Sequence, residues 1–346
     1  MPTALRAVPA VLAGALLLAA CGSESASPGG DGADGRVRAE TLCPSDFSRY
    51  GAPPPAESSA GPSGTPTALP LPSADGAAEG GVKITALYAW GSESGCAGVD
   101  YSAEFEVTNR ETESATYTVT LGFLSAAGGA VDNGERIVEA VGPGRTVKGS
   151  VVMAQPVGHA PEVSGVKVVE VRSVPAAEAS SASGPCPESG VRLYADEGDA
   201  AMGLRVVGLH LVNCGTGTYR LNGYPELELL DEDHDTVDGV RILRGTDKIS
   251  TATGGGGTPQ PVALRPGEAA EAGLAWRNTT EAGVGDPVNA PYARVRAKPG
   301  ARPVMVVPEL DLGTTGQLGV GPWKKDEAYQ DPAAPAPATA PTTQRP

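Results

Sequence analysis

The sequence is poor in aromatic residues, histidine and basic charge. Aromatic residues make up 4% of the 346 residues, there are three His, and 41 Asp and Glu outnumber 26 Lys and Arg to give a formal net charge of −15. Sites for carbohydrate and single-stranded nucleic acid commonly stack their ligands on aromatic rings, and an acidic surface repels phosphate backbones. We therefore expect no nucleic-acid partner.

Sequence motifs for cofactors and nucleophilic catalysis are missing as well. The glycine run 254–257 is followed by Thr258-Pro259, whereas a phosphate-binding loop continues with Lys and then Ser or Thr. Segment 91–95 resembles a nucleophile elbow but has Glu93 at the position of the Ser. His210 lies between Leu209 and Leu211 on a predicted strand and is expected to face away from them. We predict no catalytic, cofactor-binding or metal-binding residue.

One acidic run is tested as a calcium loop. Asp231, Asp233 and Asp235 alternate as the first ligands of such a loop do, but its sixth and twelfth positions hold Thr236 and Ile242 instead of Gly and Glu. We interpret the run as a solvated hairpin connection, with a weak two-carboxylate calcium site as the alternative. His234, inside the run, is expected to be exposed and charged.

Long hydrophobic runs are also lacking. The apolar segment 7–18 is shorter than the roughly 20 residues that cross a bilayer. It follows Arg6 and precedes Ala19-Ala20, a pattern typical of an export signal. Leu18-Ala19-Ala20-Cys21 resembles the lipobox of bacterial lipoproteins. This resemblance implies cleavage before Cys21, lipid attachment to its sulfur, and a place on the outer face of the cytoplasmic membrane.

Five cysteines are present, and lipidation consumes Cys21. The others, Cys43, Cys96, Cys186 and Cys214, face an oxidising compartment if the chain is exported. Chain organisation favours the pairs Cys43–Cys96 and Cys186–Cys214, one for each module. Four cysteines allow three pairings, and a metal site is the other alternative, although no Cys-x-x-Cys occurs.

Composition divides the chain into two β-rich modules separated by segments rich in Ala, Gly, Ser and Pro. The expected parts are a signal peptide (1–20), a lipid-anchored flexible tether that includes Cys43 (21–81), a first module (82–174), a linker (175–185), a second module (186–325) and a disordered tail (326–346). Short runs rich in Val, Thr and Tyr, broken by turn residues, predict strands in both modules. They lie at 82–90, 101–108, 116–124, 136–141, 146–153 and 166–174 in the first, and at 191–195, 204–212, 226–230, 237–241, 260–264, 269–276, 292–297 and 302–307 in the second.

Asn133-Gly134 is expected to form a turn between two of these strands. The predicted fold is all-β, with two immunoglobulin-like β-sandwich modules joined by a flexible linker.

Two segments recur in both modules. Residues 105–109 and 209–213 are strands that alternate apolar and polar residues and end at Asn, and residues 141–144 and 264–267 each end in Pro-Gly. Internal duplication explains this recurrence, as does the turn chemistry that unrelated sandwiches share.

The second module resembles a known family. The segments that carry the resemblance are Leu209, Leu211 and Asn213, then 221–225 (Leu-Asn-Gly-Tyr-Pro), 229–231, and 264–267 with Ala270, Leu274 and Trp276. They look like the domain of unknown function 4232, which occurs in secreted and lipid-anchored actinobacterial proteins. The resemblance implies location and fold class but no activity. Many members have their second Cys where this chain has Tyr219, whereas here Cys214 follows Asn213 directly.

The leading functional hypothesis is a non-catalytic binding or interaction module at the cell envelope, with an envelope protein or polymer as partner. An enzyme or enzyme accessory acting on envelope polymers and a structural spacer are the alternatives. Trp90 and Trp276 lie on predicted strands and are expected in the core, whereas Trp323 lies beyond the last one and either packs back on the module or meets a partner.

Overall fold

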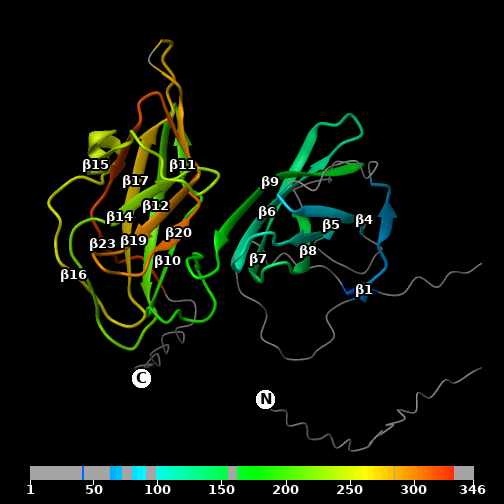
Figure 1. Ribbon diagram of the computed structural model, residues 1–346, viewed down its shortest axis with the longest axis horizontal. Coiled ribbons are helices and arrows are strands. Elements are labelled where there is room, and N and C mark those ends of the chain that lie inside the picture. The colour runs from blue at the N-terminus through cyan, green and yellow to red at the C-terminus, as the bar shows by residue number, and fades with distance from the viewer. Residues whose placement is uncertain are drawn as a thin grey trace, which may run out of the picture. The chain divides into compact units, whose positions relative to one another are not determined.

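The computed structural model describes residues 41–42, 63–71, 80–90, 99–154, 162–283 and 285–330. Within these ranges it consists of β-strands, two short 3-10 turns and no α-helix, so the all-β prediction is confirmed (Figure 1). No described helix is long and apolar enough to cross a membrane. The predicted signal peptide, Cys21, Cys43, Cys96 and the tail beyond residue 330 lie outside the described ranges.

The first module contains two antiparallel sheets. One has the strand order β3 (Thr67–Leu69), β4 (Val82–Ala89), β5 (Val99–Thr108) and β8 (Thr146–Ala154), and the other has the order β7 (Ala130–Val141), β6 (Ala115–Leu124) and β9 (Gly165–Pro175). A separate pair joins β1 (Thr41–Leu42) to β2 (Ser63–Gly64). Buried side chains of both larger sheets, including Phe105 and Phe123, form one core cluster. Two sheets that share one core are the arrangement of a β-sandwich.

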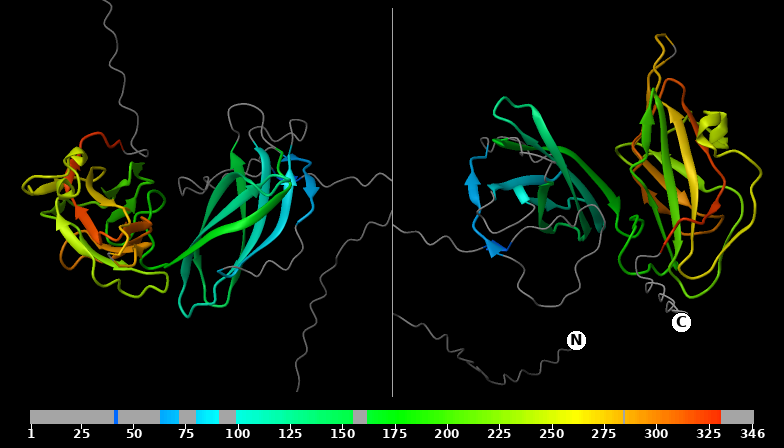
Figure 2. Two further views of the ribbon diagram at one scale, coloured as in Figure 1. Left: turned by 90° about the horizontal axis from the view of Figure 1, so that it is seen from above. Right: turned by 180° about the vertical axis from the view of Figure 1, so that it is seen from behind.

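The second module is built around one larger sheet. Its order is β10 (Val191–Ala195), β12 (Leu204–Asn213), β17 (Ala269–Arg277), β22 (Gln317–Val320) and β15 (Arg241–Arg244), with β11 (Asp199–Ala201) on β12 and β23 (Lys324–Asp326) on β17. The remaining strands are β14 (Glu226–Leu230), β19 (Tyr292–Arg296) and β20 (Val304–Val306) in one sheet, and the pairs of β13 (Tyr219–Leu221) with β16 (Val262–Leu264) and of β18 (Val288–Ala290) with β21 (Leu310–Gly313). The short turns η1 (Thr246–Lys248) and η2 (Thr251–Thr253) follow β15. Figure 2 shows late strands of this module, coloured orange and red, beside earlier green ones. Trp276 and Trp323 belong to its core cluster.

A buried asparagine organises one corner of the first module. Asn109, at the end of β5, donates from Nδ2 to the backbone oxygens of Glu113 (2.8 Å) and Val141 (2.7 Å), and its Oδ1 accepts from the N–H of Glu111. Its own backbone N–H donates to Arg145, and its oxygen accepts from the N–H of Gly144 in the Pro-Gly turn. One side chain thus joins the end of β5 to the turn before β8.

The same arrangement recurs in the second module around Asn213. Its Nδ2 donates to the backbone oxygens of Gly217 (2.8 Å) and Leu264 (2.9 Å), and its Oδ1 accepts from the N–H of Gly215. Its backbone bonds to Glu268 and Gly267 match those of Asn109 to Arg145 and Gly144.

The strand pairings correspond as well. β4, β5 and β8 pair in the same order as β10, β12 and β17, and β7 and β16 both lead into the Pro-Gly turn. The two modules therefore share one plan, as the recurring segments suggested.

Three expectations about boundaries and turns are wrong. The tether was expected to continue to residue 81, but β3 pairs with β4, and Leu69 and Leu71 pack against the core of the first module. Asn133-Gly134 lies inside β7 rather than at a turn. A Cβ on Gly134 would lie 2.2 Å from Val151 Cγ1, so this glycine permits the close approach of β7 and β8. The strand expected at 237–241 begins only at Arg241, as β15.

The linker is not a free segment. The backbone oxygen of Glu178 accepts from the N–H of Met305, its carboxylate pairs with Arg294 at 2.7 Å, and the N–H of Ser181 donates to Leu193. The predicted flexibility of residues 175–185 is therefore wrong, because the segment is hydrogen-bonded to three strands of the second module.

Candidate functional site

The candidate site of the second module lies where its strand pairing differs from that of the first module. In the first module β6 pairs with β7 on one edge and with β9 on the other along the whole of Ala115–Leu124. In the second module the corresponding stretch is interrupted, so that β13 pairs with β16 while β14 pairs with β19. Gly223, with a φ of +94°, and Pro225 lie at the interruption. Glycine accepts this backbone conformation without strain, and proline cannot donate to a strand ladder.

Trp323 fills the gap that the interruption leaves. Its backbone N–H donates to the oxygen of Gly223 at 2.9 Å, and its indole Nε1 donates to the oxygen of Ala297, just after β19, at 2.8 Å. The side chain is 1% exposed. Of the two roles left open for Trp323, the structure therefore supports packing in the core.

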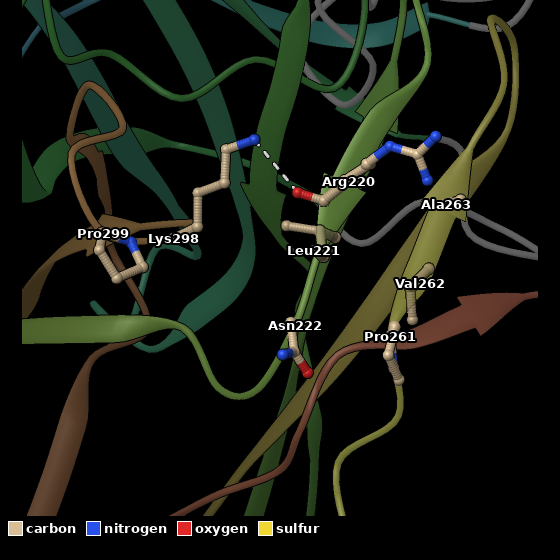
Figure 3. A pocket seen from close by; sticks show the side chains of 8 residues that line it. All are labelled: Arg220, Leu221, Asn222, Pro261, Val262, Ala263, Lys298 and Pro299. Carbon is tan, nitrogen blue, oxygen red and sulfur yellow. Dashed lines mark hydrogen bonds between the residues drawn. The ribbon is translucent and has the colours of Figure 1, made fainter.

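A pocket lies beside the interruption between β13 and β14. It has a volume of about 410 Å³, within the usual range for small-ligand sites. Its eight lining residues come from three segments: Arg220, Leu221 and Asn222; Pro261, Val262 and Ala263; and Lys298 and Pro299 (Figure 3). Leu221 and Val262, 2% and 9% exposed, belong to the core of the module and give the pocket an apolar floor.

The polar part of the pocket is cationic. Lys298 Nζ donates to the backbone oxygen of Arg220 at 3.1 Å, an approach visible in Figure 3, and lies 3.9 Å from the ring centroid of Tyr219. This cation–π contact holds the ammonium group in place, and burial raises the pKa of the Tyr219 phenol. The Arg220 guanidinium forms no hydrogen bond or ion pair with the part of the chain that the structure describes.

No carboxylate is among the eight lining residues, although the chain as a whole has a net charge of −15. Arg220 alternates with Leu221 on β13, so its exposed guanidinium points away from the apolar floor, toward Ala263 in Figure 3. The Lys298 ammonium is the charged group beside that floor, an arrangement that suits a ligand with both an anionic and an apolar group. Neither Arg220 nor Lys298 was predicted as a site residue. The signal in the sequence was the Leu-Asn-Gly-Tyr-Pro segment, whose effect on strand pairing depends on β19 and Trp323 much later in the chain.

Of the two predicted disulfides, Cys186–Cys214 is present. It joins the start of the second module to the residue after β12, with a Cα–Cα distance of 5.6 Å. The pair Cys43–Cys96 and the lipidation site Cys21 lie outside the described residues and stay predictions.

The acidic run 231–235 forms a turn that is capped by the side chain of its first residue. Asp231 Oδ1 accepts from the backbone N–H groups of Asp233 (3.0 Å) and Asp235 (2.9 Å). An Asp that caps its own turn in this way is common in connections between strands. Among the described residues, no group of three or more His, Cys, Asp or Glu side chains is arranged to hold a metal ion.

The two described histidines differ in their surroundings. His210 faces away from buried Leu209 and Leu211, as expected; its Nε2 lies 3.0 Å from Asp196 Oδ2, and its ring stacks on Tyr194. His234 is half-buried rather than exposed as predicted, because its Nε2 lies 2.9 Å from the backbone oxygen of Ser173 and its ring meets Tyr292 edge-on.

Fold and pocket together define an all-β protein of two modules built on one plan, with a cationic pocket in the second. Residues 186–324 match the family model of the domain of unknown function (DUF4232), so the second module is a domain of this family. The match includes the disulfide, Trp323 and every residue that lines the pocket. No curated protein matches the chain.

Proposed function

We propose that the protein is a lipid-anchored extracytoplasmic binding protein that catalyses no reaction itself. Its second module captures a protein or polymer of the cell envelope through the pocket lined by Leu221, Val262 and Lys298. The observation that carries this proposal is the pocket itself, which places the Lys298 ammonium beside an apolar floor, with no carboxylate among its lining residues, in an otherwise acidic chain.

The proposed location rests on two further observations. The Leu18-to-Cys21 segment resembles a lipobox, and a disulfide between Cys186 and Cys214 suits a protein that folds in an oxidising compartment. A lipid anchor confines the module near the membrane surface and raises its effective concentration for partners held there.

The test is site-specific crosslinking in intact cells. A photoreactive amino acid replaces Ala263, an exposed residue that lines the pocket, and Ala200 on β11, which is also exposed, serves as the matched control. We expect an adduct from position 263 that disappears when Arg220→Glu and Lys298→Glu are added, and no such adduct from position 200. Equal adducts from both positions, or none from position 263, would contradict the proposal.

An enzyme is the second candidate, and one observation favours it. His210 beside Asp196 is a histidine oriented by a carboxylate, the geometry of a general base. A screen of purified protein on envelope polymers addresses this alternative, because turnover abolished by His210→Gln would replace the binding proposal with a catalytic one. If the protein shows neither an adduct nor turnover, the spacer hypothesis gains support.

A further inference from the structure

The sequence contains the dipeptide Asn-Gly twice, and the structure places the two copies in different backbone environments. Asn133-Gly134 lies within β7, whereas Asn222-Gly223 follows β13, where Asn222 lines the pocket (Figure 3). Both asparagines are exposed. In this dipeptide the backbone nitrogen of the glycine is able to attack the side-chain carbonyl of the asparagine, because the glycine has no side chain to shield it.

The first copy is held in a regular strand. Asn133 pairs with Gly122 of β6, and Gly134 pairs with Leu121. A Cβ on Gly134 would lie 2.2 Å from Val151 Cγ1, so little space surrounds this glycine. An extended strand also directs the side chain out of the sheet and the next peptide group along it, which keeps the two reacting atoms apart.

The second copy lies where a strand pairing ends. The pairing of β13 with β16 reaches Leu221 and Val262, and the preceding Pro261 has no N–H with which to continue it. A Cβ on Gly223 would meet no atom within 4 Å, so this glycine is surrounded by open space. Neither the Asn222 side chain nor the Gly223 N–H forms a hydrogen bond with the described residues. The reacting groups are therefore free to approach each other.

We propose that Asn222 is a modification site at which the chain deamidates itself, and that the carboxylate formed weakens the capture of an anionic ligand. The nitrogen of Gly223 bonds to Cγ of Asn222, the bond from Cγ to Nδ2 breaks, and ammonia leaves with the proton from the peptide nitrogen. Water then opens the cyclic imide. Its attack at Cγ gives aspartate, and its attack at the backbone carbonyl gives isoaspartate.

Either product changes the charge of the pocket. The charged lining residues, Arg220 and Lys298, are both cationic, and a carboxylate at position 222 lowers their attraction for an anion. Isoaspartate also inserts a methylene group into the main chain directly before Gly223, whose oxygen accepts from the N–H of Trp323 at 2.9 Å. This effect on binding rests on the proposed function, whereas the reaction itself does not.

Peptide mapping by mass spectrometry follows both sites in the full-length protein, kept in mildly alkaline buffer with or without concentrated urea. In the folded protein we expect Asn222 to react at least about tenfold faster than Asn133, because only the second copy lets the reacting atoms approach. In urea the two rates should agree within about threefold, since neither copy is then constrained. Equal rates in the folded protein, an Asn222 that reacts only in urea, or aspartate without isoaspartate would overturn the modification site.

Asn222→Asp tests the effect on binding. With the photoreactive amino acid at position 263, we expect this variant to give at least about threefold less adduct than the wild type. Asn133→Asp is the matched control, because it adds the same charge at an exposed residue of the first module, and its adduct should be undiminished. An undiminished adduct from Asn222→Asp would refute the effect on binding. If the wild type gives no adduct, this effect fails with the binding function, and peptide mapping alone decides the reaction.

Discussion

Asn109 and Asn213 each donate to two backbone carbonyls, at the corner where the chain passes from one strand to the Pro-Gly turn before another. Both side chains are almost fully buried. A buried carbonyl left without a donor costs more than the net value of the hydrogen bond that satisfied it, since desolvation is no longer compensated. Two side-chain bonds to carbonyls, one from a backbone N–H and two backbone bonds recur in both modules, which indicates that the asparagine corner serves the fold and is not a ligand site.

Replacement of either asparagine by alanine should therefore destabilise its own module. We expect Asn213→Ala to lower the free energy of unfolding of the second module by about 2–3 kcal/mol, and Asn109→Ala to do the same for the first. Asn222→Ala is the matched control, because Asn222 is exposed and its side chain forms no hydrogen bond with the described residues. Denaturant unfolding followed by circular dichroism measures all three, and an Asn213→Ala protein as stable as Asn222→Ala would contradict this role.

His210 and Asp196 link stability to pH. The hydrogen bond with Asp196 raises the pKa of His210 above its ordinary value of 6.5, against the effect of burial, and the charges of Asp326 and Glu271 act in the same direction. Burial pushes the pKa of Asp196 upward, but hydrogen bonds from His210 and Gly208 outweigh it, so this pKa lies below its ordinary 3.8.

The directions of the two pKa shifts define the pH range in which the His210–Asp196 pair stabilises the folded protein. The contribution of His210 is fully present below pH 6.5 and is lost as pH rises through its raised pKa, whereas that of Asp196 is present above pH 3.8 and is lost as pH falls through its lowered pKa. Because the pair is partly exposed to solvent, its contribution is roughly 0.5–1 kcal/mol. Unfolding free energies at pH 6 and pH 9 should differ by about this amount more in the wild type than in His210→Gln. Parallel profiles for the two proteins would show that the pair does not contribute.

At the scale of elements, the disulfide is the best-defined constraint on the second module. Cys186 and Cys214 are 28 residues apart in sequence, and the bond ties the N-terminal segment to the end of β12. Its loss in Cys186→Ser with Cys214→Ser is expected to lower the free energy of unfolding by about 3–4 kcal/mol, chiefly because the unfolded chain gains conformational freedom.

The first module offers an internal control for that experiment. Differential scanning calorimetry of the double variant should show a lower Tm for the transition of the second module and an unchanged transition for the first. Peptide mapping without reductant tests the pairing at the same time, including Cys43–Cys96. A disulfide between Cys96 and Cys186 would contradict both pairs.

Strands long enough to show a periodic pattern could be predicted from the sequence, whereas the pocket could not. Runs such as 204–212 and 269–276 contain enough alternating or apolar residues to indicate strands, and they appear as β12 and β17. Three-residue strands such as β11 and β13 are too short to show a period. The pocket depends on β13 parting from the end of β19 and on Trp323 entering between them, and these are pairings between distant segments that no local pattern encodes.

Glycines illustrate the same limit. Asn133-Gly134 has the composition of a turn, yet Gly134 lies within β7, where Val151 of β8 leaves no room for a side chain. Gly223, by contrast, interrupts a strand through its positive φ. Sequence identifies both as special backbone positions, but only the packing around them distinguishes a close approach from a break.

At the scale of the whole molecule, the two modules share one order of strand pairing, but the second contains additional strands and turns. The second inserts η1, η2 and β15 between the strands that correspond to β6 and β7, and it adds β20 to β23 after β19. These additions supply Trp323 and Lys298, the residues that hold and line the pocket. The binding function proposed for the second module therefore resides in what it adds to the shared plan, and the first module, which lacks the interruption in β6, is not expected to bind the same ligand.

The proposed position at the membrane depends on Cys21. Arg6, the apolar segment 7–18 and Ala19-Ala20 precede this cysteine in the pattern of a lipoprotein signal, and a lipid on its sulfur would hold the mature chain at the membrane after cleavage. Cys21→Ser removes the only acceptor for that lipid, so the variant should be neither lipidated nor cleaved at the bond between residues 20 and 21.

Metabolic labelling with a fatty-acid analogue distinguishes the outcomes. The wild type should be labelled and migrate as the shorter, processed chain, whereas Cys21→Ser should be unlabelled and retain its N-terminal segment. Cys214→Ser is the matched control: it also removes a cysteine sulfur, but one in the disulfide of the second module, so label and processing should persist. Equal labelling of the wild type and Cys21→Ser would show that Cys21 is not the anchor. The crosslink from Ala263 would then have to be sought in the secreted fraction, because a protein without a lipid meets its partners only by diffusion.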